Sequence, residues 1–429
     1  MKKLIPLFLA LLMVLTVAPV IAEEEVTLSI MMSGSWIPGG PVHSSTGEIS
    51  QVVTKILPEF EKRHPNVKLE FEQLQGDTDG YNSYLLRGAA GTLPDISMLD
   101  GYWVAAFASQ GYTYAMNGRI DQAILDDYYD AFEMMYKGET HGLVYSTAYN
   151  GVVWYRTSML EAAGYTEMPS DWDGFWTAIE KMAEVNDVYG MAMSMAVTEA
   201  TTCSMLAPYW AGEDVFVDDD NVAQFNNETS VRIFNKLKEE FDKGILPPES
   251  LTLNYDGAQD LFNKGMSATL VHGSWRSTYW ENNVDFADDV AIAMWPKDPN
   301  TGISSQNAGG WSFAITTPDT TKDEYINTFL ELMLTDPEYA LLRIGEDGEI
   351  PVTQTIGALE CDWIPEQYRA AIMGELPTSK TRPVVASYPV ASEYWTQAMQ
   401  KVVMGEATAE DALAEAVKKL EEYVFDADL

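Results

Sequence analysis

Aromatic residues beside glycines are the side chains of this sequence whose type and spacing most clearly indicate a binding chemistry. The chain has 12 Trp and 22 Tyr, many for 429 residues. An indole face suits the C–H face of a sugar ring, and Asp, Asn and Arg side chains can hydrogen-bond the hydroxyls around its edge. The relevant segments are Gly34-Ser35-Trp36, Asp100-Gly101-Tyr102-Trp103, Tyr149-Asn150-Gly151, Gly273-Ser274-Trp275-Arg276 and Gly309-Gly310-Trp311.

Large aromatic residues also fill protein cores, so each tryptophan has two interpretations. Trp154, Trp172 and Trp176 fall within regular strand or helix patterns, which predicts that they are core residues. Trp275 and Trp311 follow small residues in a turn, which favours a place in a binding site.

Familiar catalytic signatures are missing from the sequence. It has no G-x-G-x-x-G turn, P-loop, H-E-x-x-H or G-x-S-x-G motif, and its four histidines are scattered. Acidic residues are too abundant for counting to rule out a pair of glycosidase-like carboxylates. We predict no enzyme activity, no cofactor and no metal site.

The formal net charge of 26 − 65 = −39 excludes nucleic acid as a partner, because such a surface repels phosphate backbones. It also disfavours a strongly anionic small ligand. The two cysteines, Cys203 and Cys361, have no metal-like spacing, and the sequence leaves open whether they form a disulfide.

The first residues are typical of a secretory signal peptide. Lys2 and Lys3 precede an apolar run over residues 4–21, and Ala22 stands before three glutamates. This pattern predicts cleavage near Ala22, with an uncleaved membrane anchor as the alternative. No cysteine follows Ala22 to carry a lipid.

Strand and helix patterns alternate after the leader, which predicts an α/β fold with mostly parallel sheets. Two-residue alternation predicts strands over 26–30, 67–71 and 95–99. A helix face over 49–60 ends at His64-Pro65, and a second helix spans 81–90. A further strand is expected over 142–155.

Two later helices have capping boxes at their starts. Ser170 with Asp173 is predicted to cap a helix containing Trp176, and Thr408 with Asp411 to cap the last helix. No tandem repeat or low-complexity linker separates domains, so short strand crossings are expected to join them.

Seven segments, in this order, resemble the extracellular solute-binding protein family 1, the group that contains maltose-binding protein. Asp100 and a predicted helix ending at Gly111 support the match, which covers the mature chain. The segments are LPEFEKRHPNV (57–67), AAGTLPDI (89–96), YNGVVWYR (149–156), AGY with PSDWDGF (163–165 and 169–175), LFNKGMSATLVHGSW (261–275), GGWSFAI (309–315) and GEATAEDAL (405–413).

This resemblance implies a two-lobed periplasmic-binding-protein fold of type II, in which discontinuous lobes are joined by a hinge. The N-terminal lobe is expected over 23–149 plus 294–336, and the C-terminal lobe over 150–293 plus 337–429. The lobes are expected to close about the hinge when a ligand bridges them.

The resemblance also places candidate ligand contacts on this sequence. Trp275 matches a tryptophan that stacks on sugar rings, Tyr149 matches a contact near the hinge, and Asp100 to Trp103 match a contact loop of the first lobe. Gly309, Gly310 and Trp311 match a cleft loop. Further candidates, placed by neighbouring motifs and chemistry, are Trp36, Asn150, Trp210, Arg276 and Arg382.

By this resemblance, the chain is expected to be a monomeric periplasmic receptor that delivers a carbohydrate, most simply an oligosaccharide, to the membrane permease subunits of an ABC transporter. The missing lipid-attachment cysteine favours a free periplasmic protein. The alternatives are an exported carbohydrate-active enzyme, a receptor for a non-sugar solute such as a polyol phosphate, and a purely sensory binding protein. The sequence does not fix the sugar, its linkage or its length.

Overall fold

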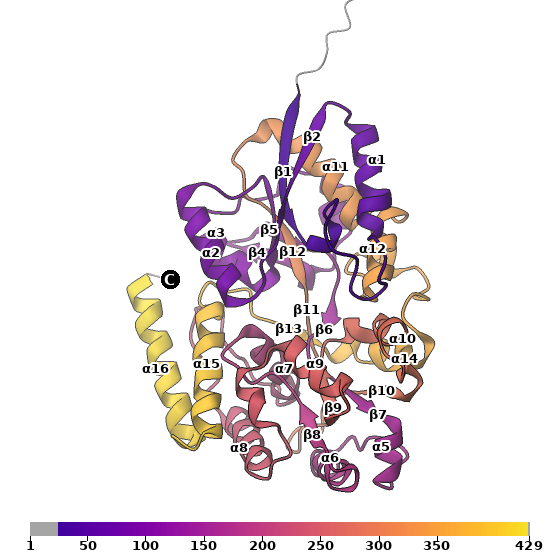
Figure 1. Ribbon diagram of the computed structural model, residues 1–429. Coiled ribbons are helices and arrows are strands. Elements are labelled where there is room, and N and C mark those ends of the chain that lie inside the picture. The colour runs from indigo at the N-terminus through magenta and orange to yellow at the C-terminus, as the bar shows by residue number, and fades with distance from the viewer. Residues whose placement is uncertain (1–24, 428–429) are drawn as a thin grey trace, which may run out of the picture.

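The computed structural model describes residues 25–427 and has two lobes with a narrow waist between them (Figure 1). The predicted signal peptide and its cleavage point near Ala22 lie outside the described residues. Each lobe is built on a β-sheet with helices around it, so the predicted two-lobed α/β fold is confirmed. The prediction of mostly parallel pairing is wrong, because antiparallel pairs outnumber parallel ones among the described strands.

The first sheet has the strand order β2-β1-β3-β12-β5-β4 within the described residues. Strand β1 is parallel to β2 and β3, whereas β12 is antiparallel to β3 and β5. The strands are β1 (Val26–Met32), β2 (Val67–Gln73), β3 (Ile96–Asp100), β4 (Glu133–Tyr136), β5 (Glu139–Val144) and β12 (Trp311–Ile315). The helices of this lobe are α1 (Leu57–Arg63), α2 (Asp77–Ala90), α3 (Val104–Ser109), α4 (Gln122–Asp126), α11 (Asp323–Leu334), α12 (Tyr339–Asp347) and α13 (Gln354–Gly357).

The second sheet has the order β10-β7-β9-β8. Its strands are β7 (Val152–Arg156), β8 (Tyr189–Ala192), β9 (Ser267–His272) and β10 (Val290–Ala293). The helices of this lobe are α5 (Thr157–Ala162), α6 (Trp172–Asn186), α7 (Glu199–Ala211), α8 (Glu228–Asp242), α9 (Tyr255–Asn263), α10 (Trp280–Asn283), α14 (Glu366–Gly374), α15 (Tyr388–Val403) and α16 (Ala409–Ala427).

A small third sheet lies at the waist, where the chain passes between the lobes (Figure 1). Its order is β13-β11-β6, formed by β6 (Ala148–Tyr149), β11 (Asn307–Gly309) and β13 (Lys380–Thr381). Because two of these strands lead directly into β7 and β12, the waist sheet ties both lobes to one frame.

The early sequence patterns fold largely as predicted. Leu28 and Ile30 of β1 are fully buried, as the alternation required, and α1 ends immediately before His64-Pro65. The helix preceding α1 starts later than predicted, so Ile49 lies outside it and is 61% exposed. Its residues Val52–Ile56 form a wide π-helical turn. Pro58 has no N–H to donate to the carbonyl of Thr54, which fits this wider turn.

The strand predicted over 142–155 is instead three strands, β5, β6 and β7, in three different sheets. The apolar pattern continues through this region because each piece is buried, although the chain crosses between lobes. The cap predicted at Ser170 is formed by the next residue, since Asp171 accepts a hydrogen bond from the Gly174 amide at 2.8 Å. The cap at Thr408 is confirmed by its bond from the Asp411 amide.

We propose lobe limits that differ from the predicted ones at the second and third crossings. Lys297 and Asp171 form a β-bridge in the second lobe, so the return to the first lobe lies at β11–β12 and not at residue 294. Helix α12 packs on α11 and on Val52–Ile56, and Gln354 of α13 bonds to Asp127. The tail therefore leaves the first lobe after α13, not at residue 336.

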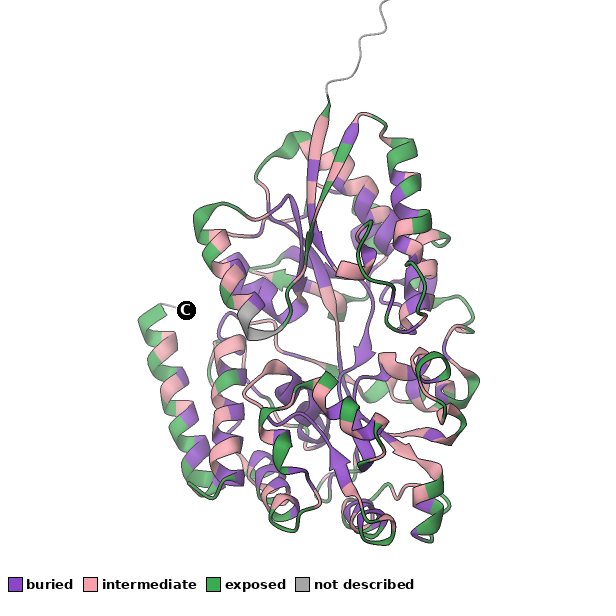
Figure 2. Ribbon diagram, viewed as in Figure 1, coloured by how far each residue is buried: buried purple, intermediate pink, exposed green. Residues whose placement is uncertain are grey.

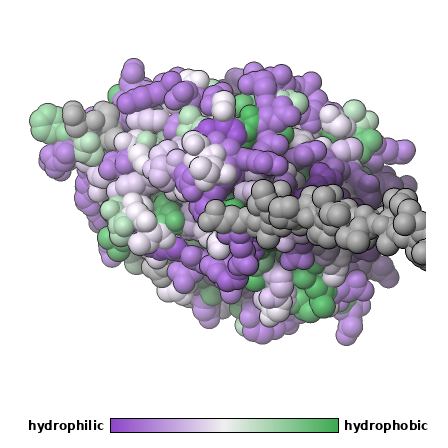
Figure 3. All heavy atoms as spheres, turned by 90° about the horizontal axis from the view of Figure 1, so that it is seen from above, coloured by the Kyte–Doolittle hydropathy of each residue, from purple (hydrophilic) through white to green (hydrophobic). Residues whose placement is uncertain are grey.

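Burial is concentrated along the strands and on the inner faces of the helices (Figure 2). Trp154, predicted to be core, is fully buried and packs edge-on against Trp280 and Tyr368. Trp176 is also core, with Trp172 half-buried beside it. Seen from the end of the first lobe, hydrophilic residues cover most of the surface (Figure 3). Within residues 25–427, no helix is both long and apolar enough to cross a membrane.

Candidate functional site

The strand ends that face the waist bring aromatic residues of the first lobe together. Trp36 follows β1, and Trp311 begins β12 directly opposite Asp100 at the end of β3. Tyr145 follows β5, whose last residue pairs with Ser312. Ligands of open α/β sheets bind outside such strand ends. The sheet topology therefore brings these aromatic side chains to the edge where a ligand is expected.

These residues line a cleft of about 640 Å³ that also includes a residue of the second lobe. We call it the aromatic cleft. Trp36, Tyr145, Trp311, Gln73, His43 and Asp347 contribute from the first lobe, and Asp256 of α9 contributes from the second. Among the described residues that line it, none is Lys or Arg. The cleft therefore offers the half-buried ring of Trp311 together with hydroxyls and carboxylates, and its described lining supplies no Lys or Arg.

A buried arginine supports the floor of the aromatic cleft. Trp36 and Tyr145 meet edge-to-face, with ring centroids 5.1 Å apart. The guanidinium of Arg343, which is fully buried, lies 4.5 Å from the centroid of Tyr145 and donates to the Tyr145 carbonyl. A buried cation against two rings holds both in place.

Acidic residues at the end of α12 border the cleft. The pKa of Glu349 is raised to about 8, chiefly by burial and then by the charge of Asp347. His43 Nε2 lies 2.8 Å from Asp347 Oδ1. Burial lowers the pKa of His43, but the bond to Asp347 and the nearby carboxylates outweigh it, so the pKa is raised overall. The loop that carries His43 is thereby held against α12.

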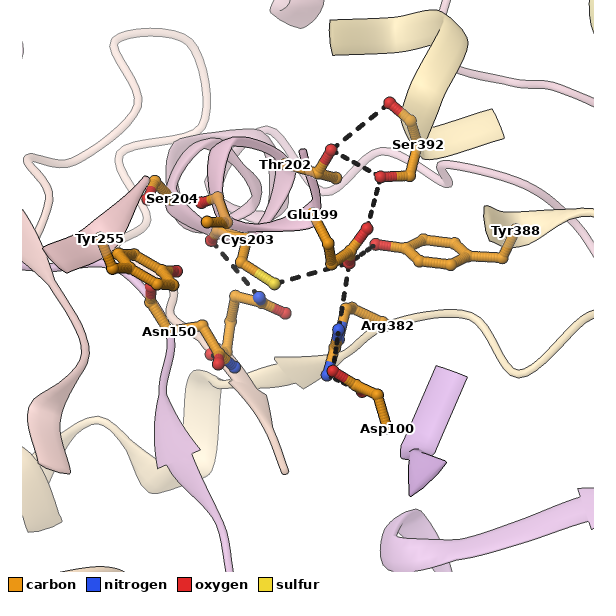
Figure 4. Close-up of polar contacts among 12 residues, drawn as sticks. Asp100, Asn150, Glu199, Thr202, Cys203, Ser204, Tyr255, Arg382, Tyr388 and Ser392 are labelled. Carbon is orange, nitrogen blue, oxygen red and sulfur yellow. Dashed lines mark hydrogen bonds and ion pairs between the residues drawn. The ribbon is translucent and has the colours of Figure 1, made fainter. Parts of the chain in front are cut away.

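A second group of polar residues lies between the lobes, around Arg382 (Figure 4). We call it the arginine network; it consists of Asp100, Glu199, Arg382, Tyr388 and Ser392. Arg382 donates to Asp100 Oδ1 at 2.6 Å and to Glu199 Oε1 at 3.0 Å. The Tyr388 hydroxyl donates to the same Glu199 oxygen at 2.9 Å. Burial raises the pKa of Asp100 to about 6 although the charge of Arg382 opposes it.

Trp275 lies on the second lobe beside Asp256 of the cleft. Its ring meets Tyr255 edge-on, with centroids 5.7 Å apart, and His272 at 5.4 Å. A Cβ on Gly273 would fall 1.9 Å from the indole, so only glycine allows the ring to lie across this backbone. Arg276 pairs with Asp256 at 3.3 Å. Trp275 and Arg276 are both half-buried.

The structure divides the predicted site residues into four groups, of which three lie at or near the cleft and the network. Trp36 and Trp311 line the aromatic cleft, although Trp36 is only 2% exposed. Trp275 and Arg276 stand next to it on the second lobe, whereas Asp100 and Arg382 are paired with each other. Gly310 lies beside them, and a Cβ there would fall 2.3 Å from the Ser146 carbonyl oxygen, so the glycine serves backbone packing.

The remaining candidates are buried outside the cleft lining. Trp103 is packed among Tyr81, Tyr84, Tyr102 and Trp311. The Tyr149 hydroxyl donates to the Ile372 carbonyl, and Trp210 and Asn150 both bond to Asn307 in the waist sheet. An aromatic residue beside a glycine does not by itself indicate an exposed face, because glycine also permits close core packing.

Sequence reasoning missed several residues of this region. Tyr145 follows a strand that ends at the same edge of the sheet as Trp311, so a search for aromatic residues just after strands would have found it, whereas the search beside glycines did not. Glu199 and Asp347 had no local signal, because their partners are distant in sequence: Arg382 is 183 residues from Glu199, and His43 is 304 from Asp347.

One set of carboxylates in the described chain is compact enough to hold a cation, but lysines occupy it. Glu180, Glu239 and Glu240 come close together. Lys243 Nζ lies 2.9 Å from Glu180, and Lys236 Nζ lies 2.7 Å from Glu240. The cluster is therefore an ion-pair group between α6 and α8.

Cys203 and Cys361 are free thiols in the structure. The Cys203 sulfur lies 3.5 Å from Glu199 Oε1, at the edge of the arginine network. Burial raises the pKa of Cys203 well above its usual range, which keeps the thiol protonated and unreactive.

Comparisons with known proteins agree with this architecture. Residues 43–340 match the family model of the bacterial extracellular solute-binding protein. A binding protein of Brucella abortus (strain 2308) is 20% identical over 404 residues, which cover 91% of this chain and 95% of that protein.

Two solved structures share the fold. The maltose-bound MalE3 of T. maritima superposes with a TM-score of 0.78 at 20% identity, covering 93% of this chain and 100% of that one. A substrate-binding protein of Listeria monocytogenes in complex with cycloalternan superposes with a TM-score of 0.75 at 20% identity, covering 94% and 99%.

Proposed function

The chain belongs to the bacterial extracellular solute-binding protein family, and from this premise we propose that it is the substrate-binding component of an ABC importer, capturing a carbohydrate outside the cytoplasmic membrane. The ligand binds in the aromatic cleft, and the two lobes close over it at the waist sheet. The loaded protein then delivers it to the permease subunits. The predicted signal peptide supports a periplasmic location, and we propose that the protein acts there as a monomer.

The observation that carries this proposal is the composition of the aromatic cleft. Trp311 contributes a half-buried ring beside the nearly buried Trp36 and Tyr145, and Gln73 and Asp256 provide polar groups of the kind that bind sugar hydroxyls. A polyol phosphate would need an unpaired cation there; the described lining contains no Lys or Arg, and the neighbouring Arg276 is paired with Asp256. The maltose and cycloalternan bound by the two structural relatives support the same ligand class.

Trp275 contributes a further stacking surface from the second lobe. The Trp275 ring makes edge-on contacts with Tyr255 and His272, and the indole lies against Gly273. We propose that this ring packs on a sugar when the lobes close. Arg276 and Asp256 beside it then hydrogen-bond the hydroxyls.

Isothermal titration against neutral oligosaccharides, uronides and sugar phosphates tests the proposal. We expect binding to a neutral oligosaccharide, and Trp275→Ala should weaken it by about 1–3 kcal/mol, the scale of one large aromatic surface. Trp172→Ala is the control, because this half-buried tryptophan lies on α6 with Trp176, outside the cleft lining. Binding of only an anionic or non-sugar solute would contradict the carbohydrate assignment, and turnover of a glycoside would identify an enzyme.

A further inference from the structure

Arg382 connects three separate parts of the molecule. It follows β13 of the waist sheet, Asp100 ends β3 in the first lobe, and Glu199 begins α7 in the second. Its guanidinium makes two hydrogen bonds to Asp100, at 2.6 and 3.3 Å, and one to Glu199 at 3.0 Å. It also lies 4.4 Å from the ring centroid of Tyr102. Each lobe therefore contributes one carboxylate to the same cation.

The carboxylate of Glu199 is fully occupied by protein donors. One oxygen accepts from Arg382 and Tyr388, and the other accepts from Ser392. Glu199 is also in the first turn of a 13-residue helix, where the helix dipole stabilises a negative charge. These contacts offset the cost of removing the charges from water.

This saturation argues against Asp100 and Arg382 as direct ligand contacts. Arg382 is 6% exposed, and its two terminal nitrogens already donate to carboxylates. A ligand that reached this guanidinium would have to displace Asp100 or Glu199. Both carboxylates accept charge-assisted hydrogen bonds from Arg382, and such bonds are about twice as strong as neutral ones.

We propose that Asp100, Arg382 and Glu199 form a latch that holds the two lobes together, and that Glu199 is its positioning residue on the second lobe. The latch rests on the closure motion of the proposed function. Opening the lobes separates Asp100 from Arg382 or Arg382 from Glu199. The latch thus sets the balance between open and closed forms before any ligand binds.

Distance measurement by pulsed electron resonance on the ligand-free protein tests the latch. Spin labels are attached at Lys62→Cys in the first lobe and Lys264→Cys in the second, whose native side chains are 76% and 62% exposed. Cys361→Ser removes the more accessible native thiol. Glu199→Gln and Asp100→Asn each keep the side-chain shape and remove one charge.

We expect each substitution to raise the ratio of long to short distances about tenfold, the effect of losing charge-assisted hydrogen bonds. The double variant should add little, because both residues act through Arg382. Arg119→Met is the matched control: Arg119 and Asp323 pair at 2.6 Å within the first lobe, so the distances should not change.

The latch would be overturned if both single variants kept the distances of the unsubstituted protein. Near-ultraviolet circular dichroism must show that these variants are folded. Weaker ligand binding at unchanged distances would instead make these residues ligand contacts and also overturn the latch. The distance measurement uses no ligand. A carbohydrate panel without a binder would therefore contradict the proposed function and leave the latch result standing.

Discussion

The aromatic cleft and the arginine network lie at the same boundary between the lobes but are built in opposite ways. The cleft has a volume of about 640 Å³, and its lining combines rings with hydroxyls and carboxylates. In the network, Arg382 is 6% exposed and its terminal nitrogens bond to protein carboxylates. The cleft keeps an open space for a ligand although its charged groups also have partners, whereas the network is largely buried and its groups bond within the protein.

This difference separates two tasks that the pairing of β3 with β12 places side by side. Asp100 and Trp311 are directly paired between neighbouring strands, yet one joins the network and the other lines the cleft. A binding protein needs contacts that a ligand completes and contacts that set the rest position of the lobes. We propose that adjacent residues carry out these two tasks, so variants on the two sides should behave differently.

The largest effect is expected on the network side, from Arg382→Met. The substitution leaves Asp100 and Glu199 buried without their cation, which should cost about 3–5 kcal/mol of unfolding free energy. Urea unfolding followed by circular dichroism measures it. Arg87→Met is the control, since its pair with Glu72 is partly exposed and worth about 1 kcal/mol or less. Equal losses in both variants would mean that the network is an ordinary surface cluster.

On the cleft side, Trp311→Ala should act on binding more than on stability. Trp311 is half-buried and touches Trp103 edge-on, so its loss should weaken sugar binding by about 1–3 kcal/mol, as measured by titration. Trp280→Phe is the opposite case, because Trp280 is fully buried in the second lobe. It should lower the unfolding midpoint and leave affinity unchanged. If Trp311→Ala lowered stability alone and Trp280→Phe lowered affinity, the binding surface would lie elsewhere.

Glu349, close to Asp347 of the cleft, should make the unfolding free energy depend on pH. Its pKa is about 8 in the folded protein against an ordinary 4.5, so the folded protein binds more protons than the unfolded chain between these values. Stability due to this group is therefore lost as pH rises from about 5 towards 8. Glu349→Gln should reduce the loss of unfolding free energy between pH 5 and 7 by about 1–2 kcal/mol.

The control for this comparison is Glu421→Gln on the exposed side of α16. The pH dependence of urea unfolding should match that of the unsubstituted protein in this variant. An identical slope in Glu349→Gln as well would mean that the Glu349 carboxyl is charged throughout this range.

The smallest effect is expected from Asp256→Asn. Asp256 lines the cleft and pairs with Arg276, but its side chain is 81% exposed. Water screens such a pair, so unfolding free energy should change by less than about 1 kcal/mol. Thermal and urea unfolding measure it. A loss comparable to that of Arg382→Met would mean that this pair stabilises the second lobe as strongly as a buried ion pair does.

Sequence reasoning succeeded where neighbouring residues decide the outcome. The alternation in β1, the end of α1 before His64-Pro65 and the cap at Thr408 all depend on residues a few positions apart. The order of the family segments identified the two-lobed fold. Prediction was weaker at the crossings, because the apolar run over 142–155 continues through three sheets.

The candidate site was predicted only in part, for a related reason. The pattern of aromatic residues beside glycines selected Trp36 and Trp311, which line the cleft, but Trp36 is almost as buried as Trp103 and Tyr149, which the same pattern selected. Asp100 and Arg382 were predicted as ligand contacts, which stays a prediction; the structure shows them paired with each other between the lobes. Nothing near them in the sequence indicated that they bond to each other across 282 residues.

The sequence by itself determined the α/β class, the family and the chemistry available at the waist, because these follow from residue types, local periodicity and the order of short segments. Only the tertiary structure decided which aromatic faces remain open and which charges are paired. Those outcomes depend on contacts between residues far apart in the chain, such as Glu199 with Arg382, and burial then decides whether a ring or a carboxylate is left for a ligand.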